Sequence, residues 1–328
     1  MRLADTLGLD PLVTDLERVE AGLSAAVRSD DRFLADVATH LIRAGGKRVR
    51  PTLTLCASYA AARAGAGDPA PDDAVTGAVA IELVHLGSLY HDDVIDEAAV
   101  RRGVPSVNAR WSNIVAILAG DFLLARASER AATLGGDVAG LLAATIGSLC
   151  RGQVLELQHL FDVDRPESGY LDAIGGKTAA LFSTACRIGG VAGGAAEPTL
   201  DALATFGRHV GMCFQIVDDV LDVTATDAEL GKPVGNDLLE GVYTLPVIYA
   251  LAKSSDLREL IGRPLDPEAL AEARAIVARD SAVPRALDVA REHAAKACAA
   301  LDQARSTLDA DVADALCRFT EGLVSRQS

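Results

Sequence analysis

Two short acidic clusters constrain this chain more than any other feature of its sequence. They consist of Asp92, Asp93 and Asp96, and of Asp218, Asp219 and Asp222. Each follows an apolar run that favours a helix. Residues four apart on a helix share a face, so the outer aspartates of each cluster point the same way. Two carboxylates about 4 Å apart repel by roughly 1 kcal/mol in water, and by several times that in a less polar cleft. A hard cation between the oxygens would relieve this repulsion.

Mg²⁺ suits this pattern, because it binds one or two carboxylates and fills its other positions with waters and substrate phosphates. A single cluster of this kind is more often a solvated helix end. Its repetition about a third of the chain later predicts two opposed walls of one cation-filled cavity, with all six aspartates as candidate ligands for several Mg²⁺ ions. An EF-hand is excluded, because Val94 and Val220 occupy positions that would need oxygen ligands.

The composition indicates the fold class. Of the 328 residues, 50% are hydrophobic and only 4% are aromatic. Long helical patterns recur, and no run shows the alternation of a strand. Helices with broad apolar faces must bury those faces on one another. The sequence therefore predicts one all-α domain over residues 1–328, a single bundle of long helices.

Charge and cysteine content narrow the partners and the compartment. The net charge of −15 argues against nucleic acid and anionic membrane as constitutive partners. The six cysteines are scattered without metal-binding spacing, so we expect small buried residues in a reducing cytoplasm. The N-terminus lacks the apolar core of a signal peptide, and no uncharged apolar run reaches the roughly 18 residues of a membrane span.

Glycine, proline and capping residues divide the chain into its expected helices. A first pair covers about residues 11–43, with a break and cap at Asp30 or Asp31. Residues 63–73 read as a loop. Further long helices are expected over 111–134 and 138–161, and three shorter amphipathic helices after residue 257.

The residues alone leave the roles of two features undecided. The basic turn GGKRVRP, residues 45–51, either complements a helix dipole or binds an anion. His85 lies two helical turns before Asp92 on the same face, and is either a satisfied core histidine or a ligand.

The sequence Gly-Gly-Lys-Thr at 175–178 invites comparison with a phosphate-binding loop. A Walker A motif needs glycine at position 171, which is leucine, and no strand precedes it. The phosphate-loop interpretation therefore fails. We still expect a helix to start here, which would place Lys177 and Thr178 where they can meet a phosphate.

Five motifs in order resemble those of the trans-type polyprenyl diphosphate synthases. They are GGKRVRP, HDDVIDEAAVRRG, KTAALF, FQIVDDVLD and GKPVGNDLLEG, within residues 45–246. The resemblance implies an all-α isoprenoid-synthase bundle around a deep central cavity, usually a homodimer. It also implies a reaction that joins an allylic diphosphate head-to-tail to isopentenyl diphosphate. The departing diphosphate would accept the proton, so no side-chain base is required.

The resemblance also assigns roles to residues. Mg²⁺ held by the outer aspartates would take up charge on the leaving diphosphate. The implied catalytic residues are Asp92, Asp96, Lys177, Asp218 and Lys232. The implied contacts to the allylic diphosphate are Arg101, Lys177, Gln215 and Lys232, and those to isopentenyl diphosphate are Lys47, Arg50, His85 and Arg102. One departure is Val242, where many family members have lysine.

We expect a long product, of about six to ten isoprene units. The face of the central helix beneath Asp92 carries Ser88 and Gly87, which leave room for a growing chain, and then Val84 and Ile81. Ile114, Ile117 and Leu118 of the next helix would line its continuation. The alternative is that the small residues only let two helices pack closely. Release of such a product implies transient membrane contact.

Three other functions are weighed against this one. A terpene cyclase or head-to-head synthase would not explain two DDxxD clusters together with GGKRVRP. A non-catalytic partner subunit of a heteromeric synthase would be expected to lose the acidic motifs, which this chain keeps. A short-chain synthase making products of fifteen to twenty carbons is the third alternative.

Overall fold

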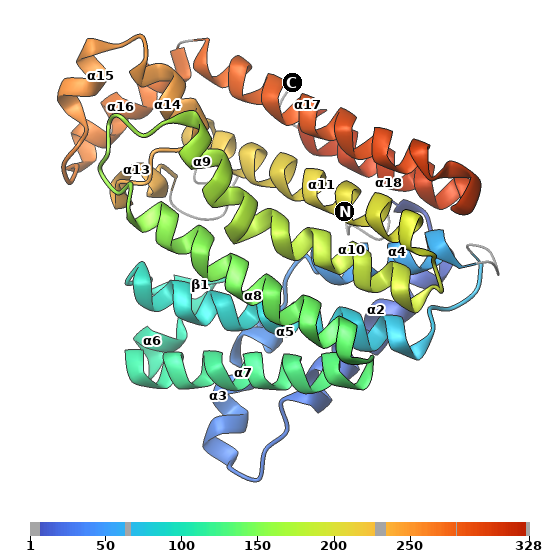
Figure 1. Cartoon of the computed structure of the whole chain (residues 1–328). Helices are drawn as coiled ribbons and strands as arrows, with labels where there is room; N and C mark the ends of the chain where they lie inside the picture. The colour runs from blue at the N-terminus through green and yellow to red at the C-terminus, as the bar shows by residue number, and fades with distance from the viewer. Residues whose placement is uncertain (1–6, 63–66, 227–233, 280, 326–328) are drawn as a thin grey trace. The chain divides into compact units, whose positions relative to one another are not determined.

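The computed structural model describes residues 7–62, 67–226, 234–279 and 281–325, and it is almost entirely helical (Figure 1). The predicted all-α class is confirmed. One small hairpin interrupts it, in which β1 (Val100–Arg101) pairs antiparallel with β2 (Val104–Pro105). This hairpin was not predicted, because each strand is only two residues long and too short to show an alternating pattern.

The remaining elements fall in chain order. The first half comprises α2 (Asp10–Ala26), α3 (Arg32–Arg43), α4 (Val49–Ala61), α5 (Asp72–Ile95), α6 (Val107–Arg110), α7 (Asn113–Thr133) and α8 (Gly136–Leu157). Then follow α9 (Glu167–Ile174), the π-helical turn η1 (Gly175–Ala179), α10 (Ala180–Ala192) and α11 (Glu197–Thr224). The last elements are α13 (Asn236–Glu240), α14 (Leu245–Leu251), α15 (Ser255–Leu260), α16 (Pro267–Arg279), α17 (Ala282–Gln303), the 3₁₀ turn η2 (Arg305–Thr307) and α18 (Ala310–Ser325).

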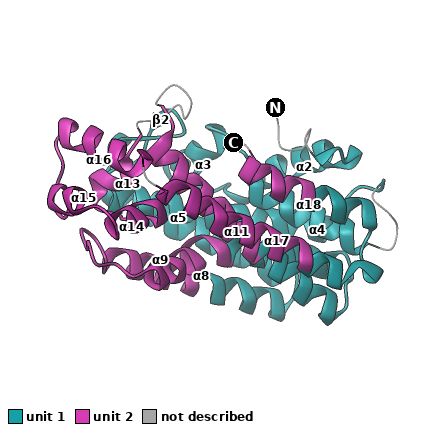
Figure 2. Ribbon diagram, turned by 90° about the horizontal axis from the view of Figure 1, so that it is seen from above, with its two compact units in different colours: residues 1–146, 181–207, 300–316 teal, residues 147–180, 208–299, 317–328 magenta. Residues whose placement is uncertain are grey.

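The chain divides into two compact units, coloured separately in Figure 2. Unit 1 comprises Met1–Ile146, Leu181–Gly207 and Ala300–Leu316, and unit 2 comprises Gly147–Ala180, Arg208–Ala299 and Cys317–Ser328. Both units are therefore assembled from segments far apart in sequence. The first acidic cluster belongs to unit 1 and the second to unit 2.

The first helices of unit 1 follow the predicted boundaries closely. The Asp31 side chain caps α3 by accepting hydrogen bonds from the backbone N–H groups of Phe33 and Leu34, at 2.9 and 3.1 Å. The basic turn then separates α3 from α4, as expected. Helix α4 begins at Val49, directly after Arg48, whose φ of 48° is left-handed. A side chain in this region is uncommon and indicates a local constraint.

The most extensive packing in unit 1 joins α5 to α7 (Figure 1). Two glycines permit this close approach. A Cβ on Gly87 would lie 3.1 Å from the carbonyl oxygen of Gly120 and 3.2 Å from the Leu124 side chain. A Cβ on Gly120 would overlap the imidazole of His91. The small residues on both helices therefore let α5 and α7 approach closely.

The Gly-Gly-Lys-Thr segment in unit 2 is not the start of a helix, so that prediction was wrong. Helix α9 continues through η1 into α10, and Lys177 and Thr178 lie inside the π-helical turn. The glycines serve close packing instead. A Cβ on Gly176 would lie 2.8 Å from the Ser148 carbonyl oxygen, and one on Gly152 would overlap the backbone nitrogen of Lys177.

The cysteines agree only partly with expectation. All six are free thiols. Cys56, Cys186 and Cys213 are buried, as predicted for small core residues, but Cys150 is exposed.

A histidine pair in unit 2 should make the stability of the protein depend on pH. The Nδ1 atoms of His209 on α11 and His293 on α17 are 2.9 Å apart, so one ring must donate and the other must accept. Burial, with Lys296 and Arg208 nearby, lowers the pKa of both rings, and that of His293 falls to about 4.

An unfolded histidine titrates near 6.5, so the pair's contribution to stability is complete above that pH and is lost as pH falls toward 4. The Tm measured between pH 7 and 4.5 should therefore fall less in His293→Gln than in the wild type. Parallel curves for the two proteins would contradict this.

Candidate active site

The three aspartates of the first cluster differ in environment. Asp92 lies in the last turn of α5 and Asp96 is its C-cap, and both are half-buried. Asp93 is fully buried, and its Oδ1 accepts a hydrogen bond of 2.6 Å from Nε of Arg101. Burial raises the pKa of Asp93, and Arg101 opposes that rise. Asp93 and Arg101, predicted to bind metal and diphosphate, thus bind each other.

The β1–β2 hairpin places Arg101 and Arg102. Arg102 and Gly103 form its two-residue turn with φ of 54° and 75°, which is the backbone of a type I′ turn. The Arg102 guanidinium then reaches the turn after α3, where NH1 donates to the carbonyl oxygens of Leu41 and Gly45. The hairpin and the basic turn are therefore held together by Arg102.

The basic turn is fixed from its other side by Arg48. Its NH1 donates to Glu82 on α5 at 2.8 Å, and its Nε donates to Glu20 on α2 at 2.5 Å. These contacts hold the buried side chain of Arg48, the residue whose backbone is left-handed. Lys47, one residue earlier, is exposed. The turn thus directs one basic residue into the core and one into solvent.

Arg50 and His85 are half-buried members of this basic group. Burial lowers the pKa of Arg50 to about 10, against the attraction of Glu82. Its guanidinium lies 4.8 Å from the centre of the Phe182 ring. Burial and then the charges of Arg50 and Arg102 lower the pKa of His85 well below its usual value. His85 is therefore a neutral ring beside arginines, whose positive charge favours an anionic ligand over a metal cation.

In the second cluster, the middle aspartate joins three elements of unit 2. Asp219 on α11 is buried, and its Oδ2 accepts a 2.5 Å hydrogen bond from the Tyr170 hydroxyl on α9. Its Oδ1 accepts a 2.7 Å hydrogen bond from Gln215. The Gln215 carbonyl oxygen in turn accepts from the Thr178 hydroxyl at 2.7 Å. Gln215 and Thr178, both predicted to contact diphosphate, therefore contact each other.

The outer aspartates lie in the last turns of α11, with Asp218 half-buried and Asp222 buried. Asp222 accepts a hydrogen bond from the backbone N–H of Asp237 at 3.2 Å. Burial and nearby carboxylates raise the pKa of Asp219 to about 7 and that of Asp237 well above its usual range. This crowding of carboxylates is what a divalent cation relieves.

Protein ligands alone do not complete a metal site. Within the described residues, no group of three or more His, Cys, Asp or Glu side chains is placed to hold a metal ion. Mg²⁺ does not require such a group, since it retains waters and binds phosphate oxygens. The half-buried Asp92, Asp96 and Asp218 have the oxygen chemistry and access that Mg²⁺ needs.

Lys177 has an acidic partner that the sequence did not suggest. Its Nζ forms an ion pair with Glu156 on α8. Lys232, predicted to bind diphosphate and to act in catalysis, lies outside the described residues.

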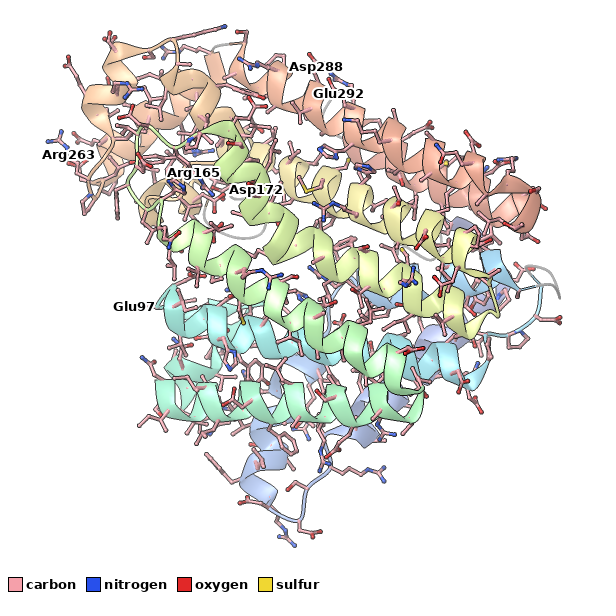
Figure 3. The ribbon with its side chains drawn as sticks, viewed as in Figure 1. Glu97, Arg165, Asp172, Arg263, Asp288 and Glu292 are labelled. Atoms are coloured by element: carbon pink, nitrogen blue, oxygen red, sulfur yellow. The ribbon has the colours of Figure 1, made fainter. Side chains whose placement is uncertain are left out.

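Val242, which stands where many family members have lysine, lies close to a buried arginine. Arg165, labelled in Figure 3, donates from NH1 to the carbonyl oxygen of Tyr243 at 3.1 Å. It is only 4% exposed, and its Nε and NH2 have no hydrogen-bond partner among the described residues. Its charge also acts on Asp219 and Glu156. A cation is thus present one residue from the position where the family's lysine is missing.

The predicted product tunnel is only partly consistent with the structure. Gly87 packs against α7, as in the alternative interpretation. Ile114 and Leu118 are 70% and 60% exposed, so lining an interior tunnel was a wrong prediction for them and for the exposed Ile117. Ser88 remains half-buried on the face below Asp92.

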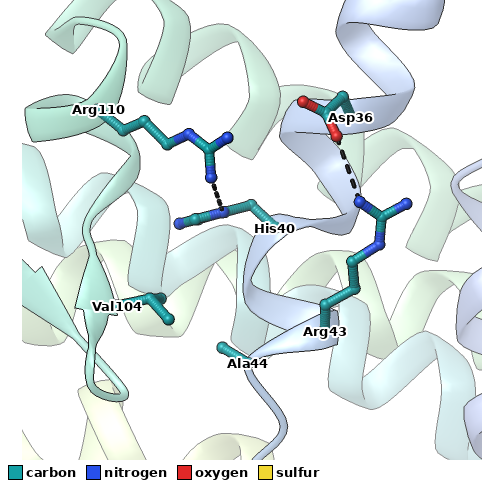
Figure 4. A pocket seen from close by; sticks show the side chains of 6 residues that line it. All are labelled: Asp36, His40, Arg43, Ala44, Val104 and Arg110. Atoms are coloured by element: carbon teal, nitrogen blue, oxygen red, sulfur yellow. Dashed lines mark hydrogen bonds and ion pairs between the residues drawn. The ribbon is translucent and has the colours of Figure 1, made fainter.

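A surface pocket of about 260 Å³ lies between α3, Val104 of the hairpin and Arg110 (Figure 4). Its polar groups already have partners. His40 contacts the Pro105 carbonyl oxygen through Nε2 at 2.7 Å and Arg110 through Nδ1 at 3.3 Å. Because Nδ1 accepts from the guanidinium, Nε2 carries the proton. Arg43 pairs with Asp36 at 3.3 Å. This pocket is therefore not the candidate site.

Comparison with known proteins agrees with the fold and these motifs. The model of the polyprenyl synthetase family matches residues 31–278. The chain is 43% identical over 294 residues to heptaprenyl diphosphate synthase component 2 of Geobacillus stearothermophilus, covering 89% of this chain and 90% of that protein. It is 41% identical over 304 residues to nonaprenyl diphosphate synthase of Mycobacterium tuberculosis, covering 90% and 88%.

The structural likeness is equally extensive. The crystal structure of a polyprenyl synthase from Caulobacter crescentus, complexed with calcium and isoprenyl diphosphate, matches with a TM-score of 0.90 and 33% identity, covering 99% of this chain and 98% of that one. The chain belongs to the polyprenyl synthetase family, and the resemblance inferred from its motifs is confirmed.

Sequence reasoning missed four residues that organise the site: Arg48, Glu82, Glu156 and Tyr170. Glu82 carried a readable signal, because it is a charged residue within an apolar helical run. Arg48 stood inside a motif but was not singled out. Nothing in the sequence indicates that Tyr170 contacts Asp219, which is 49 residues away.

The two adjacent aspartates should differ in their effect on stability. Asp93→Asn removes the charge that holds Arg101, which is 30% exposed and can partly rehydrate, so we expect a loss of about 1–2 kcal/mol. Asp92→Asn should cost less, because Asp92 is half-buried and lies among like charges. Urea unfolding of both variants measures this, and a larger loss in Asp92→Asn would contradict the assignment.

Proposed function

We propose that this chain is a Mg²⁺-dependent trans-prenyltransferase that condenses isopentenyl diphosphate with an allylic diphosphate. The products of this condensation are a longer all-trans polyprenyl diphosphate and free diphosphate. Family membership supports the reaction class. The assignment of both substrates to this chain's residues is our proposal. The family match also spans segments of both units, in line with one polyprenyl synthase domain.

The observation that carries the proposal is the basic group beside the first acidic cluster in unit 1. Arg50 lies close enough to Asp92 for the two charges to interact, and Arg102 and the neutral His85 lie beside Arg50. A desolvated group of arginines binds a diphosphate through charge-assisted hydrogen bonds. We assign isopentenyl diphosphate to Arg50, His85, Arg102 and the exposed Lys47.

The allylic diphosphate is assigned to Mg²⁺ and to residues of both motifs. Asp92, Asp96, Asp218 and Asp222 would hold the ions, while Asp93 and Asp219 are engaged by Arg101, Tyr170 and Gln215. Bound Mg²⁺ would stabilise the negative charge that develops on the departing diphosphate. Lys177 would exchange its ion pair with Glu156 for the diphosphate, and Lys232 keeps its predicted role. Apolar side chains near the site would exclude water from the carbocation.

Single substitutions of the outer aspartates test this reaction. Asp92→Ala and Asp218→Ala should each lower kcat by about two orders of magnitude, because each loses stabilisation of the leaving-group charge. The assay combines purified protein, Mg²⁺, isopentenyl diphosphate and an allylic starter, and it detects products by mass. Near-normal turnover in either variant, with Tm unchanged, would contradict the metal assignment. Absence of any condensation by the wild type would contradict the proposed function.

The product is proposed to be long, in the range of six to ten isoprene units. The names of the two relatives specify heptaprenyl and nonaprenyl products, and no aromatic side chain occupies positions 87 or 88. Ser88 is the test position, because Gly87 already packs against α7. Ser88→Phe should shorten the product while condensation continues, and Ser88→Ala should not. A fifteen-carbon product from the wild type, or an unchanged product length in Ser88→Phe, would contradict a product tunnel along this face of α5.

A homodimer is proposed from the exposed apolar face of α7. Ile114, Ile117 and Leu118 lie on one side of that helix and are exposed in the single chain, and a second copy would bury them. Among the described residues, α8 alone is long and apolar enough to span a membrane, by length and composition only. Its exposed Val154 and Leu157 equally suit a protein interface. Sedimentation of the purified chain should give a dimer, and a monomer at micromolar concentration would contradict this.

A heteromeric enzyme is the second candidate, because one relative is named as component 2 of its synthase. The same assay distinguishes the two, since a chain that needs a partner would be inactive alone.

The free cysteines support a cytoplasmic location, and release of the product would involve transient membrane contact.

A further inference from the structure

Glu82 is a buried carboxylate surrounded by arginines from different segments. It lies on α5 and is 1% exposed. Its Oε1 is 2.8 Å from NH1 of Arg48 and 3.8 Å from NH2 of Arg102. Its charge also acts on Arg50, whose Nε is buried without a hydrogen-bond partner among the described residues. One carboxylate therefore faces three guanidinium groups.

These guanidinium groups would repel one another without an anion between them. Their charges oppose each other, as shown by the lowering of the pKa of Arg102, caused first by burial and also by Arg48, against the attraction of Glu82. Before any diphosphate binds, Glu82 is the buried counterion of the group. Buried charges require such pairing, because desolvation is otherwise too costly.

The contacts of Glu82 also set geometry. Two edges of Arg102 are fixed by different partners, since NH1 donates to the carbonyl oxygens of Leu41 and Gly45 while NH2 faces Glu82. Through Arg48, Glu82 also holds the turn on which Lys47 and Arg50 are carried. A bidentate cation binds a phosphate well only when its fork is already oriented.

We propose that Glu82 is a positioning residue for isopentenyl diphosphate, which orients Arg102 and the basic turn before the substrate arrives. Glu82 itself touches no substrate. The inference rests on the proposed function, in which Arg50 and Arg102 bind this diphosphate, and it goes beyond it by naming the group that preorganises them.

Glu20 offers a matched control. It also accepts hydrogen bonds from Arg48, at 2.5 and 3.1 Å. Of the two carboxylates, only Glu82 is within ion-pair distance of Arg102. Removing either charge weakens the anchor of Arg48, but only removal of Glu82 takes away the carboxylate that faces NH2 of Arg102, while NH1 stays bonded to backbone carbonyl oxygens.

The experiment compares Glu82→Gln with Glu20→Gln and the wild type. We expect KM for isopentenyl diphosphate to rise about tenfold in Glu82→Gln, the effect of one lost charge-assisted contact. KM for the allylic substrate should change little, and Glu20→Gln should stay within about threefold of the wild type. Calorimetry with isopentenyl diphosphate alone gives the same comparison without turnover. Glu82→Asp, which retains the charge, should recover part of the loss.

Three outcomes would overturn the inference. An unchanged or lower KM in Glu82→Gln would mean that removing a negative charge helps the anion more than lost orientation harms it. An equal rise in Glu20→Gln would mean that the effect passes through Arg48 and packing alone. An equal rise in KM for both substrates would mean general damage.

Failure of the proposed function would be recognised separately, because the wild type would then neither condense nor bind isopentenyl diphosphate. If Glu82→Gln does not fold, Glu82→Asp is compared with Glu20→Asp, and only the first should raise KM.

Discussion

The pairing of buried carboxylates on α5 with arginines from other segments is the interaction on which unit 1 depends. Glu82 and Asp93 are both fully buried on α5, and Arg48, Arg101 and Arg102 neutralise them. Each pair is costly to break, because the remaining charge would stay desolvated. The positions of the basic turn and of the hairpin follow from these pairs, since both segments are short and have little core of their own.

In both acidic clusters, each within its own unit, the middle aspartate has different contacts from the outer two. Adjacent residues on a helix point about 100° apart, so two neighbouring aspartates project in different directions. In the first cluster Asp93 turns to Arg101, and in the second Asp219 turns to Tyr170 and Gln215. The buried contacts of the middle aspartate therefore stabilise the fold, and the outer aspartates are the ones that we propose as Mg²⁺ ligands. On this proposal, the DDxxD pattern combines a structural role with a metal-binding role.

How much the sequence could predict depends on the range of the interactions involved. Helix boundaries such as the Asp31 cap are local and were predicted, as were the all-α class and the family. The contacts of Glu82 with Arg48 and of Tyr170 with Asp219 join residues 34 and 49 positions apart, and no local pattern specifies them. The left-handed backbone at Arg48 and the π-helical turn at Lys177 were not predicted either. Gly87 was ambiguous because a small residue suits a tunnel and a tight helix contact equally.

The net charge of −15 explains why the arginines of this protein need to be held in place. Both proposed substrates are multiply charged anions, so the average field of the protein does not attract them. Screening limits exposed charges to about 8 Å at physiological salt, which leaves local, desolvated cations as the source of binding. Such cations are effective only if they are held in place without the ligand, and their mutual repulsion opposes that. A buried carboxylate beside the arginines meets this requirement, because it offsets their mutual repulsion and holds their guanidinium groups in place. Glu82 occupies that position on α5, between Arg48 and Arg102.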